Sequence, residues 1–293
     1  MIAPVREAGQ RLPHLRVCTV AGQLVPRGAS DPGDADSVAH ARLLEATHAM
    51  TTTHDKAALV IGAGDGTGGA IAARFAREGF VACPVRRTAD KLEPLVRAIE
   101  AAGGRVRAYG RDARKEEQMV ALVDEIERDI GPIEVAVFNV GANVPASILE
   151  ETARKYFKIW EMACFGGFLM GREVARRMVP RGRGTIIYTG ATASVRGSAN
   201  FAAFAGAKHA LRALAQSMAR ELGPRGIHVA HVVIDGAIDT EFIRTAFPET
   251  YARKDHGGIL DPAHIAEHFW ILHTQPRDTW TFELDLRPWT ETW

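Results

Sequence analysis

A run of glycines between an apolar segment and a helix-forming segment carries the strongest chemical signal in this sequence. Residues 57–61 are apolar, residues 70–76 favour a helix, and Gly62-Ala63-Gly64-Asp65-Gly66-Thr67-Gly68-Gly69 lies between them. Glycine permits positive φ angles and a close approach of the backbone, and the amides at a helix start face an anion. We therefore predict a loop that holds the diphosphate of a dinucleotide; the alternative is a glycine-rich turn without a ligand. The predicted contacts are Gly62, Gly64, Gly66, Thr67 and Gly68.

Two arginines, Arg86 and Arg87, follow the next apolar segment, 81–85. In a dinucleotide site, a carboxylate at this place accepts a hydrogen bond from the 2′-hydroxyl of NAD, whereas an arginine accommodates the 2′-phosphate of NADP. A guanidinium suits phosphate because it is always charged and can donate two parallel hydrogen bonds. The pair predicts NADP(H). NAD stays an alternative, since two solvated arginines would look the same and Asp65 in the loop argues mildly against NADP.

The segments that must position these residues alternate between short β-rich runs and longer helical patterns. Repeated strand–helix–strand units need right-handed crossovers and a parallel sheet that is covered on both faces. We predict an α/β fold in which a doubly wound, seven-stranded, mostly parallel sheet has helices on both faces. The predicted strands are 57–61, 81–85, 105–109, 133–138, 185–189, 228–234 and 281–286.

A single domain is predicted over residues 53–293, and a poorly ordered arm over residues 1–52. The arm has no sustained helical or alternating apolar pattern, so it offers no face to bury. Met50 lies just before the domain and is a candidate for the initiator residue.

Nearly all of residues 57–293 resembles the short-chain dehydrogenase/reductase family. Gly62, Gly66 and Gly68 match the GxxxGxG cofactor loop of that family. The resemblance implies a Rossmann-type fold, a nicotinamide dinucleotide cofactor, a small-molecule substrate and hydride transfer between an alcohol and a carbonyl. Further cofactor contacts implied by the resemblance are Asp112 at the adenine ring, Asn139 and Gly141 of an NNAG-like segment, and Gly236, Ile238 and Thr240 at the nicotinamide end.

The proton-handling positions depart from the family pattern. The family motif YxxxK places a tyrosine as general acid and base before a lysine, which lowers the phenol pKa and holds the cofactor ribose. This chain has Phe204 and Lys208 at those two positions. The position of the family's catalytic serine, thirteen residues before Phe204, holds Ala191, and the position of its relay asparagine holds Cys164. A phenylalanine has no proton to give, and loss of a positioned general acid costs about 10²–10⁴ in rate.

No other residue replaces the tyrosine by simple spacing. The nearest hydroxyls are those of Tyr188, Thr189, Thr192 and Ser194. Phe201 occupies the place where the family's enoyl reductases carry their tyrosine. Phe204 also lies on an apolar stripe of its helix, so a packing role is the simplest alternative for it.

Two functional hypotheses follow. The first is an NADP(H)-preferring oxidoreductase with an atypical active site, in which Lys208 binds the ribose and another group or a water handles the proton. The second is a catalytically inactive dinucleotide-binding protein that senses the cofactor or serves in an assembly. Only the first predicts turnover of a carbonyl or alcohol substrate.

Charge and composition narrow the partners. Lys and Arg total 36 against 35 for Asp and Glu, so no net field draws this chain to nucleic acid or to an anionic membrane. We found no apolar stretch of the ~20 residues that cross a bilayer. Three cysteines are too few for a disulfide framework, which predicts a reducing, cytoplasmic compartment.

Two helical segments bear on assembly and on metal binding. A long helix is expected over about 150–178, with Tyr156, Phe157, Trp160 and Phe165; the resemblance implies that it pairs with the helix of Phe204 across a homodimer or homotetramer interface. His264-Ile265-Ala266-Glu267-His268 matches a zinc-hydrolase pattern. An amphipathic surface helix started by Asp261-Pro262 is the simpler interpretation, and we predict no metal site.

Overall fold

The computed structural model describes residues 55–292, and the arm expected over 1–52 lies outside that range. Its framework is one sheet in which every strand pair is parallel. Such a sheet buries both faces, and the strands are accordingly rich in Val, Ile, Leu and Ala. The strands are β1 Ala57–Ile61, β2 Val81–Arg86, β3 Arg105–Val106, β4 Tyr109–Gly110, β5 Ile133–Phe138, β6 Gly184–Thr189, β7 Ile227–Ile234 and β8 Glu283–Leu286.

The strand order reverses between β1 and β5. The order across the sheet is β3-β2-β1-β5-β6-β7-β8, so the chain winds to one side after β1 and to the other side after β5. The chain segments that leave these two neighbouring strands diverge, which opens a crevice at the carboxyl ends of the strands. The doubly wound α/β prediction is confirmed.

One predicted strand is wrong in detail. The segment 105–109 forms two short strands, β3 and β4, that both pair with β2, so the sheet has eight strands in seven positions. Between them the backbone N–H of Arg107 donates to the Ala82 carbonyl at 2.9 Å, while the Arg107 side chain bonds to Glu125 and Asp129. The last strand also begins at Glu283, two residues later than expected.

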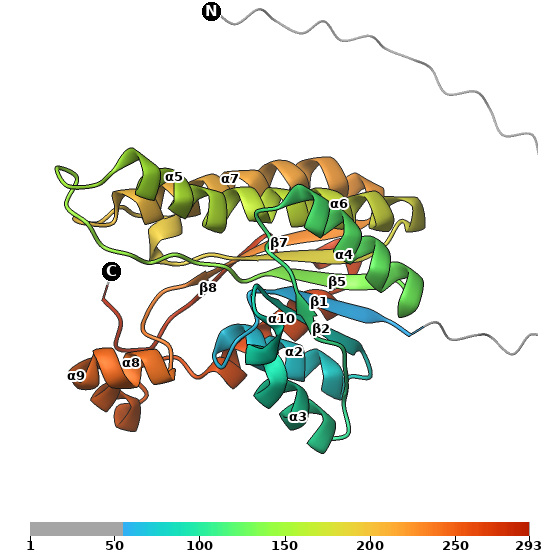
Figure 1. Ribbon diagram of the computed structural model, residues 1–293, viewed down its shortest axis with the longest axis horizontal. Coiled ribbons are helices and arrows are strands. Elements are labelled where there is room, and N and C mark those ends of the chain that lie inside the picture. The colour runs from blue at the N-terminus through green and yellow to red at the C-terminus, as the bar shows by residue number, and fades with distance from the viewer. Residues whose placement is uncertain (1–54, 293) are drawn as a thin grey trace, which may run out of the picture. The chain divides into compact units, whose positions relative to one another are not determined.

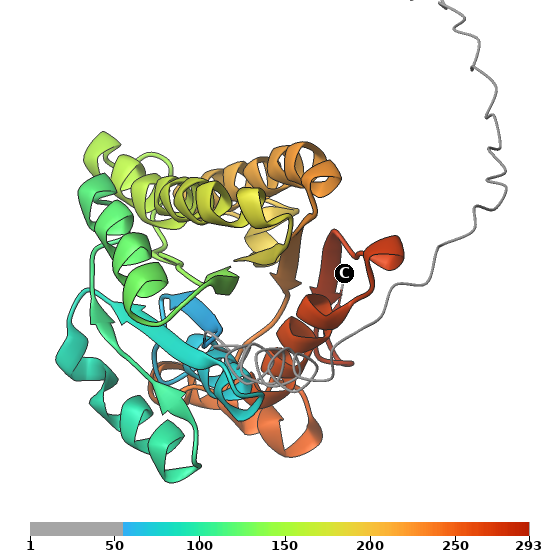
Figure 2. The same cartoon turned by 90° about the vertical axis from the view of Figure 1, so that its right-hand side faces the viewer.

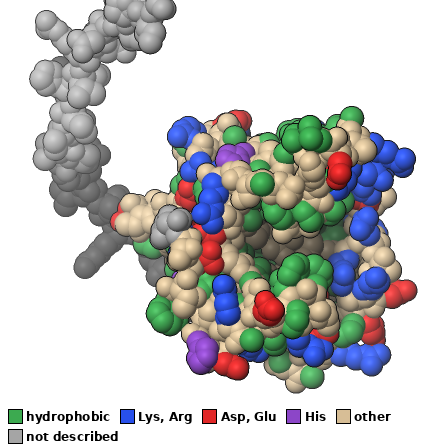
Figure 3. Space-filling view, turned by 90° about the vertical axis from the view of Figure 1, so that its left-hand side faces the viewer, with side chains coloured by type: hydrophobic (Ala, Val, Ile, Leu, Met, Phe, Trp, Pro, Cys, Tyr) green, Lys and Arg blue, Asp and Glu red, His purple; other side chains and the backbone are tan. Residues whose placement is uncertain are grey.

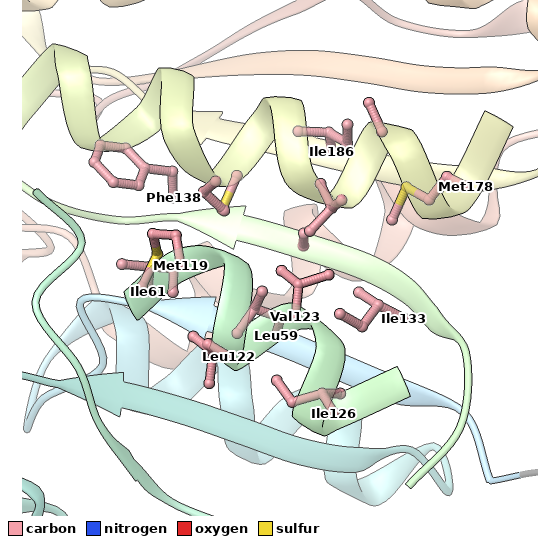
Figure 4. Packing of buried hydrophobic residues seen from close by; sticks show 14 of the residues in the cluster. Leu59, Ile61, Met119, Leu122, Val123, Ile126, Ile133, Phe138, Met178 and Ile186 are labelled. Carbon is pink, nitrogen blue, oxygen red and sulfur yellow. The ribbon is translucent and has the colours of Figure 1, made fainter. Parts of the chain in front are cut away.

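Helices cover both faces of the sheet (Figures 1 and 2). One core lies under α4, α6 and α7, and Figure 4 shows Met119, Leu122 and Ile126 of α4 packed toward the sheet. The second core lies under α2, α3 and α10. The α-helices are α2 Thr67–Arg77, α3 Glu93–Ala101, α4 Glu116–Asp129, α5 Ala153–Trp160, α6 Gly166–Arg181, α7 Ala202–Leu222, α8 Glu241–Ala246, α9 Pro248–Ala252 and α10 Pro262–Thr274. Among residues 55–292, no helix combines the length and the apolar character that a bilayer span requires.

The long helix expected over 150–178 is not one regular α-helix. A π-helical segment, Glu161–Phe165, joins α5 to α6. The rings of Trp160 and Phe165, five residues apart, stack at 5.9 Å between centroids because the wider turn brings them into line. Phe157 and Phe168 extend the stack at 5.9 and 6.0 Å. We call Phe157, Trp160, Phe165 and Phe168 the aromatic row.

Candidate active site

The glycine loop lies at the reversal of strand order, where β1 runs into α2. Gly62 has a φ of +86°, and a Cβ there would lie 2.4 Å from the Asn139 carbonyl oxygen. A Cβ on Gly68 would lie 2.5 Å from the Gly62 carbonyl oxygen. The two glycines therefore let β1, the loop and the end of β5 meet backbone to backbone. Asn139 adds a side-chain hydrogen bond from Nδ2 to the Gly62 carbonyl at 3.2 Å.

The start of α2 presents polar groups that lack a capping side chain among residues 55–292. Gly66 is the N-cap of the helix and makes no side-chain cap hydrogen bond. The Thr67 hydroxyl is buried and has no hydrogen-bond partner within the described residues. Free amides at a helix start carry partial positive charge. The predicted contacts Gly62, Gly64, Gly66, Thr67 and Gly68 thus form a backbone cradle that fits a diphosphate.

A first pocket extends from the loop to the ends of β2 and β4. Arg86 and Arg87 line it together with Asp112, as do Gly62, Gly64, Asn139 and Gly141. Arg86 is half-buried and Arg87 is exposed. The structure therefore brings the two predicted phosphate-binding arginines to the same pocket as the glycine loop.

Asp112 is held by a residue that the sequence reasoning missed. The Arg114 side chain donates to both carboxylate oxygens, at 2.9 Å from Nε and 2.6 Å from Nη2. These hydrogen bonds hold the pKa of Asp112 below its usual range. The Asp–x–Arg spacing was the available signal. Asp112 lines the pocket as an ionised, oriented carboxylate.

A second pocket adjoins the first, and Asn139, Val140 and Gly141 line both. Figure 3 views the side at the left of Figure 1, where the strands end, and shows a hollow near its centre. This second pocket has a volume of about 430 Å³. Its lining brings together Phe204, Lys208 and Ala191 with Gly236 and Ile238.

Lys208 is the buried cation of the second pocket. Only 3% of its surface is exposed, and its Nζ donates to the carbonyls of Val140 at 3.0 Å and Thr189 at 2.7 Å. Burial lowers the Lys208 pKa to about 8. An ammonium has three protons, so these two bonds leave one for another acceptor. The Lys208 geometry therefore fits a ribose hydroxyl.

The other proton-handling positions carry no acid here. Phe204 packs in an apolar cluster with Ala142, Ile159 and Ala163, and its ring centroid lies 5.9 Å from the Lys208 Nζ. Cys164 lies in the π-helical segment and is not among the residues that line the second pocket. Burial raises the pKa of its thiol to about 11, so the thiol stays protonated near neutral pH.

Tyr188 is excluded as a replacement acid. Its side chain is fully buried in the core under α6 and α7, where the hydroxyl bonds to the Gly167 carbonyl at 3.3 Å. Burial raises its pKa above the usual range. Ser194 is also fully buried and accepts a hydrogen bond from the Ala191 N–H at 3.1 Å.

A hydrogen bond between Thr192 and Asp235 is the main feature that sequence reasoning missed. Thr192 lines the second pocket, and its hydroxyl donates to the Asp235 carboxylate. Asp235 is 6% exposed and directly precedes Gly236. No local pattern in the sequence indicated this bond, because the partners are 43 residues apart.

Thr240 and the HxxEH segment lie outside both pockets. Thr240 caps α8, and its Cγ2 lies 2.9 Å from the position of a Cβ on Gly66, so it contacts the glycine loop. His264 and His268 lie on α10, as the amphipathic-helix prediction required. Glu267 between them pairs with Arg74 at 2.7 Å and Arg77 at 3.2 Å. No group of three potential metal ligands exists within residues 55–292.

A parallel, doubly wound sheet with a glycine loop at its reversal point defines the class of dinucleotide-binding α/β proteins. The family model described as short chain dehydrogenase matches residues 56–250. The chain therefore belongs to the short-chain dehydrogenase family, whose members are NAD(P)-dependent oxidoreductases.

Individual relatives agree with this assignment. The chain is 31% identical to the short-chain reductase protein NovJ of Streptomyces niveus over 75% of this chain and 82% of that protein. The crystal structure of a short-chain dehydrogenase from Rhodopseudomonas palustris matches this chain with a TM-score of 0.68, over 80% of this chain and 99% of that chain. The two sequences are 48% identical. A metagenomic short-chain oxidoreductase in complex with NADP is 25% identical, with a TM-score of 0.70 over 80% of this chain and 98% of that chain.

Proposed function

We propose that this chain is an NADP(H)-preferring oxidoreductase that interconverts an alcohol and a carbonyl compound without the tyrosine and serine of its family. The observation that carries the proposal is the meeting of two pockets along 139–141, one beside the glycine cradle and one around Lys208. A dinucleotide needs such a continuous path, because its diphosphate and its nicotinamide lie at different places. The relative solved with NADP supports the choice of cofactor class.

Each group of residues around the two pockets has a separate role in this proposal. The amides at the start of α2 hold the diphosphate, and Arg86 and Arg87 bind a 2′-phosphate. The third proton of Lys208 goes to a ribose hydroxyl. When bound, the dinucleotide supplies or accepts a hydride. Apolar side chains such as Ala191, Ala193 and Phe204 line the remaining space and keep water from the reacting carbon.

The direct test measures binding and turnover in sequence. NADPH and NADH are titrated by fluorescence, and a panel of aldehydes, ketones and alcohols is then assayed with the cofactor that binds. We expect tighter binding of NADPH and measurable turnover, and both are expected to weaken in Lys208→Ala. Absence of a fluorescence change in the titration, together with an unchanged melting temperature in the presence of either dinucleotide, contradicts the proposal.

The competing function is a dinucleotide-binding protein without catalysis, favoured by the lack of an ionisable side chain at Phe204 and Ala191. The Phe204→Tyr/Ala191→Ser double variant separates the two functions, since it restores the family's hydroxyl pair. Turnover that appears only in this variant supports the inactive protein. Turnover in the wild type, lost in Lys208→Ala, supports the oxidoreductase.

A further inference from the structure

The wall of the second pocket contains a hydroxyl that is bonded to a buried carboxylate. Thr192 begins a 3-10 turn after β6, and Asp235 directly follows β7, so both lie at the carboxyl edge of the sheet. β6 and β7 are neighbours in the sheet, which brings together residues that are distant in the sequence. Thr192 lines the pocket and its Oγ1 donates to Asp235 Oδ1. The carboxylate is thereby linked to the pocket through one hydroxyl.

Asp235 is buried and oriented from behind. Its backbone N–H donates to the Leu286 carbonyl at 2.8 Å, which fixes it against the end of β8. Its second oxygen, Oδ2, lies 3.7 Å from Nη1 of Arg287. Burying a carboxylate costs free energy unless a charged or hydrogen-bonding group is its partner. Arg287 and Thr192 are those partners, and the Thr192 partner faces the pocket.

The residues at the family's proton-handling positions, Tyr188 and Lys208 do not replace this hydroxyl. Phe204 and Ala191 have no exchangeable side-chain proton. Tyr188 lies in the core on the far side of its strand, where its hydroxyl bonds to a backbone carbonyl. Lys208 is committed to two carbonyls and to the proposed ribose contact. Thr192 is the pocket hydroxyl with a direct hydrogen bond to a carboxylate.

We propose that Thr192 is the catalytic hydroxyl of this enzyme and that Asp235 is the positioning residue that takes its proton. The inference rests on the proposed oxidoreductase function. In alcohol oxidation, the C–H bond of the carbinol carbon breaks, and its hydride goes to the oxidised nicotinamide dinucleotide. The substrate O–H proton passes to Thr192 Oγ1 as the Thr192 proton passes to Asp235 Oδ1. Carbonyl reduction reverses these transfers and begins with a protonated Asp235.

Four variants test this assignment. Thr192→Val removes the hydroxyl at nearly constant shape, and Thr192→Ser keeps it. Asp235→Asn keeps a hydrogen-bond acceptor for Thr192 but cannot take up a proton, so it separates proton transfer from bracing. Thr274→Val is the matched control, because Thr274 ends α10 outside both pockets and its hydroxyl donates to the carbonyls of Trp270 and Ile271.

We expect kcat to fall about 10²–10⁴-fold in Thr192→Val and Asp235→Asn, the usual range for loss of a positioned acid or base. Thr192→Ser is expected to retain most of the turnover, and Thr274→Val all of it. Two readouts are independent of turnover: the NADPH dissociation constant, expected unchanged in all four, and the melting temperature of the cofactor-free protein. The decreases in melting temperature caused by Thr192→Val and by Asp235→Asn should not add in the double variant, since both substitutions alter the same hydrogen bond.

The outcomes separate this inference from the function on which it rests. Wild-type turnover that persists in Thr192→Val overturns the inference and leaves the oxidoreductase intact. If Asp235→Asn keeps full turnover, and turnover falls only in variants whose melting temperature also falls, the Thr192–Asp235 hydrogen bond has a structural role only. That result overturns the proposed proton transfer. NADPH binding without wild-type turnover of any aldehyde, ketone or alcohol overturns the proposed function and this inference together. Rescue of Thr192→Val by added Phe204→Tyr and Ala191→Ser supports it, because a second proton donor then replaces the first.

Discussion

The ammonium of Lys208 lies where bulk water does not reach it, and its two bonds to backbone carbonyls compensate only in part for the lost hydration. Burial lowers its pKa from 10.5 to about 8. A lysine with a lowered pKa destabilises the folded state as long as both states hold the proton. The same residue that would grip a ribose is therefore a source of pH-dependent stability.

The sign of that dependence follows from the two pKa values. Below about pH 8 both states are protonated, so the penalty is constant. Between pH 8 and 10.5 the unfolded chain holds more protons, so the free energy of unfolding rises with pH. Relative to Lys208→Met, the wild type should gain about 3 kcal/mol across this window.

Chemical denaturation of both proteins across this pH range measures the difference. The comparison with Lys208→Met is needed because two buried thiols also make stability depend on pH. Burial raises the pKa of Cys83 to about 12 and that of Cys164 to about 11. Above the pKa of a free thiol, these two groups therefore make the free energy of unfolding fall as pH rises. Both thiols are present in both proteins. A difference that stays constant with pH would contradict a lowered Lys208 pKa.

Arg86 carries the prediction on cofactor choice. Arg86→Asp should weaken NADPH binding about 10- to 100-fold, since hydrogen bonds to charged groups contribute about 1.5–3 kcal/mol. NADH binding should be retained or improved, because the new carboxylate can accept from a 2′-hydroxyl. Fluorescence titration measures both. Arg97→Asp, the same charge change at an exposed side chain paired with Glu93, is the control; equal NADPH affinity in the two variants would refute the 2′-phosphate contact.

At the scale of elements, the passage from β1 through the glycine loop into α2 requires residues without a Cβ atom. Gly68 has the Gly62 carbonyl oxygen at 2.5 Å from its missing Cβ and the Ala63 Cα at 2.8 Å. Backbone atoms cannot move aside as a flexible side chain can. By contrast, the nearest atom to a Cβ on Gly64 is Nη1 of Arg86, at 3.8 Å.

Gly68→Ala and Gly64→Ala form a matched pair for stability. Gly68→Ala should cost about 1–3 kcal/mol, the range for overpacking, which lowers the melting temperature by several degrees. Gly64→Ala should leave the melting temperature close to that of the wild type. Calorimetry of the cofactor-free proteins compares them. Equal melting temperatures would mean that the loop adjusts without strain.

The elements also show where sequence reasoning succeeds and where it stops. Strands 57–61 and 133–138 were predicted at their true bounds, because fully buried parallel strands are mostly apolar runs and Glu134 is the one charged residue in these two. The positions of Gly62, Arg86, Asp112 and Lys208 beside the two pockets follow likewise from their fixed offsets from a strand or a motif, whereas their contacts with a cofactor stay predictions.

Features that depend on contacts between distant elements were not predictable. The π-helical segment was missed, although the five-residue spacing of Trp160 and Phe165 was a signal for it. The spacing of Thr192 to Lys208 does not match the family mechanism, so the sequence alone does not single Thr192 out. Its bond to Asp235 arises only when β6 and β7 pair, and local spacing carries no trace of that.

At the scale of the whole molecule, α5 and α6 leave an apolar face uncovered. Phe157 is 59% exposed and Phe168 is 36% exposed, both in the aromatic row. A groove beside them between α6 and α7 is lined by residues such as Val179, Leu214 and Met218. We propose that this face joins copies of the chain in a homodimer or homotetramer, as large exposed apolar patches mark interfaces.

Phe157→Glu combined with Phe168→Glu should shift the protein to the monomer, since two charges per copy would be buried at a symmetric contact. Light scattering after size exclusion measures the molar mass, and dinucleotide affinity serves as the check on folding. Ile271→Glu, at a residue 49% exposed on α10, is the control for a charge placed on another helix. A monomeric wild type, or an unchanged mass in the double variant, would contradict this interface.

The π-helical segment relates this surface to the length of the chain rather than to its composition. Each residue of an α-helix turns the chain by about 100°, so the five-residue step from Trp160 to Phe165 would place these rings about 140° apart in a regular α-helix. The π-helical turn removes that offset. Deleting one residue within 161–164 would leave a four-residue step in a regular α-helix, about 40° apart. A single-codon deletion, with every aromatic side chain retained, should therefore keep the four rings on one face without the π-helical turn.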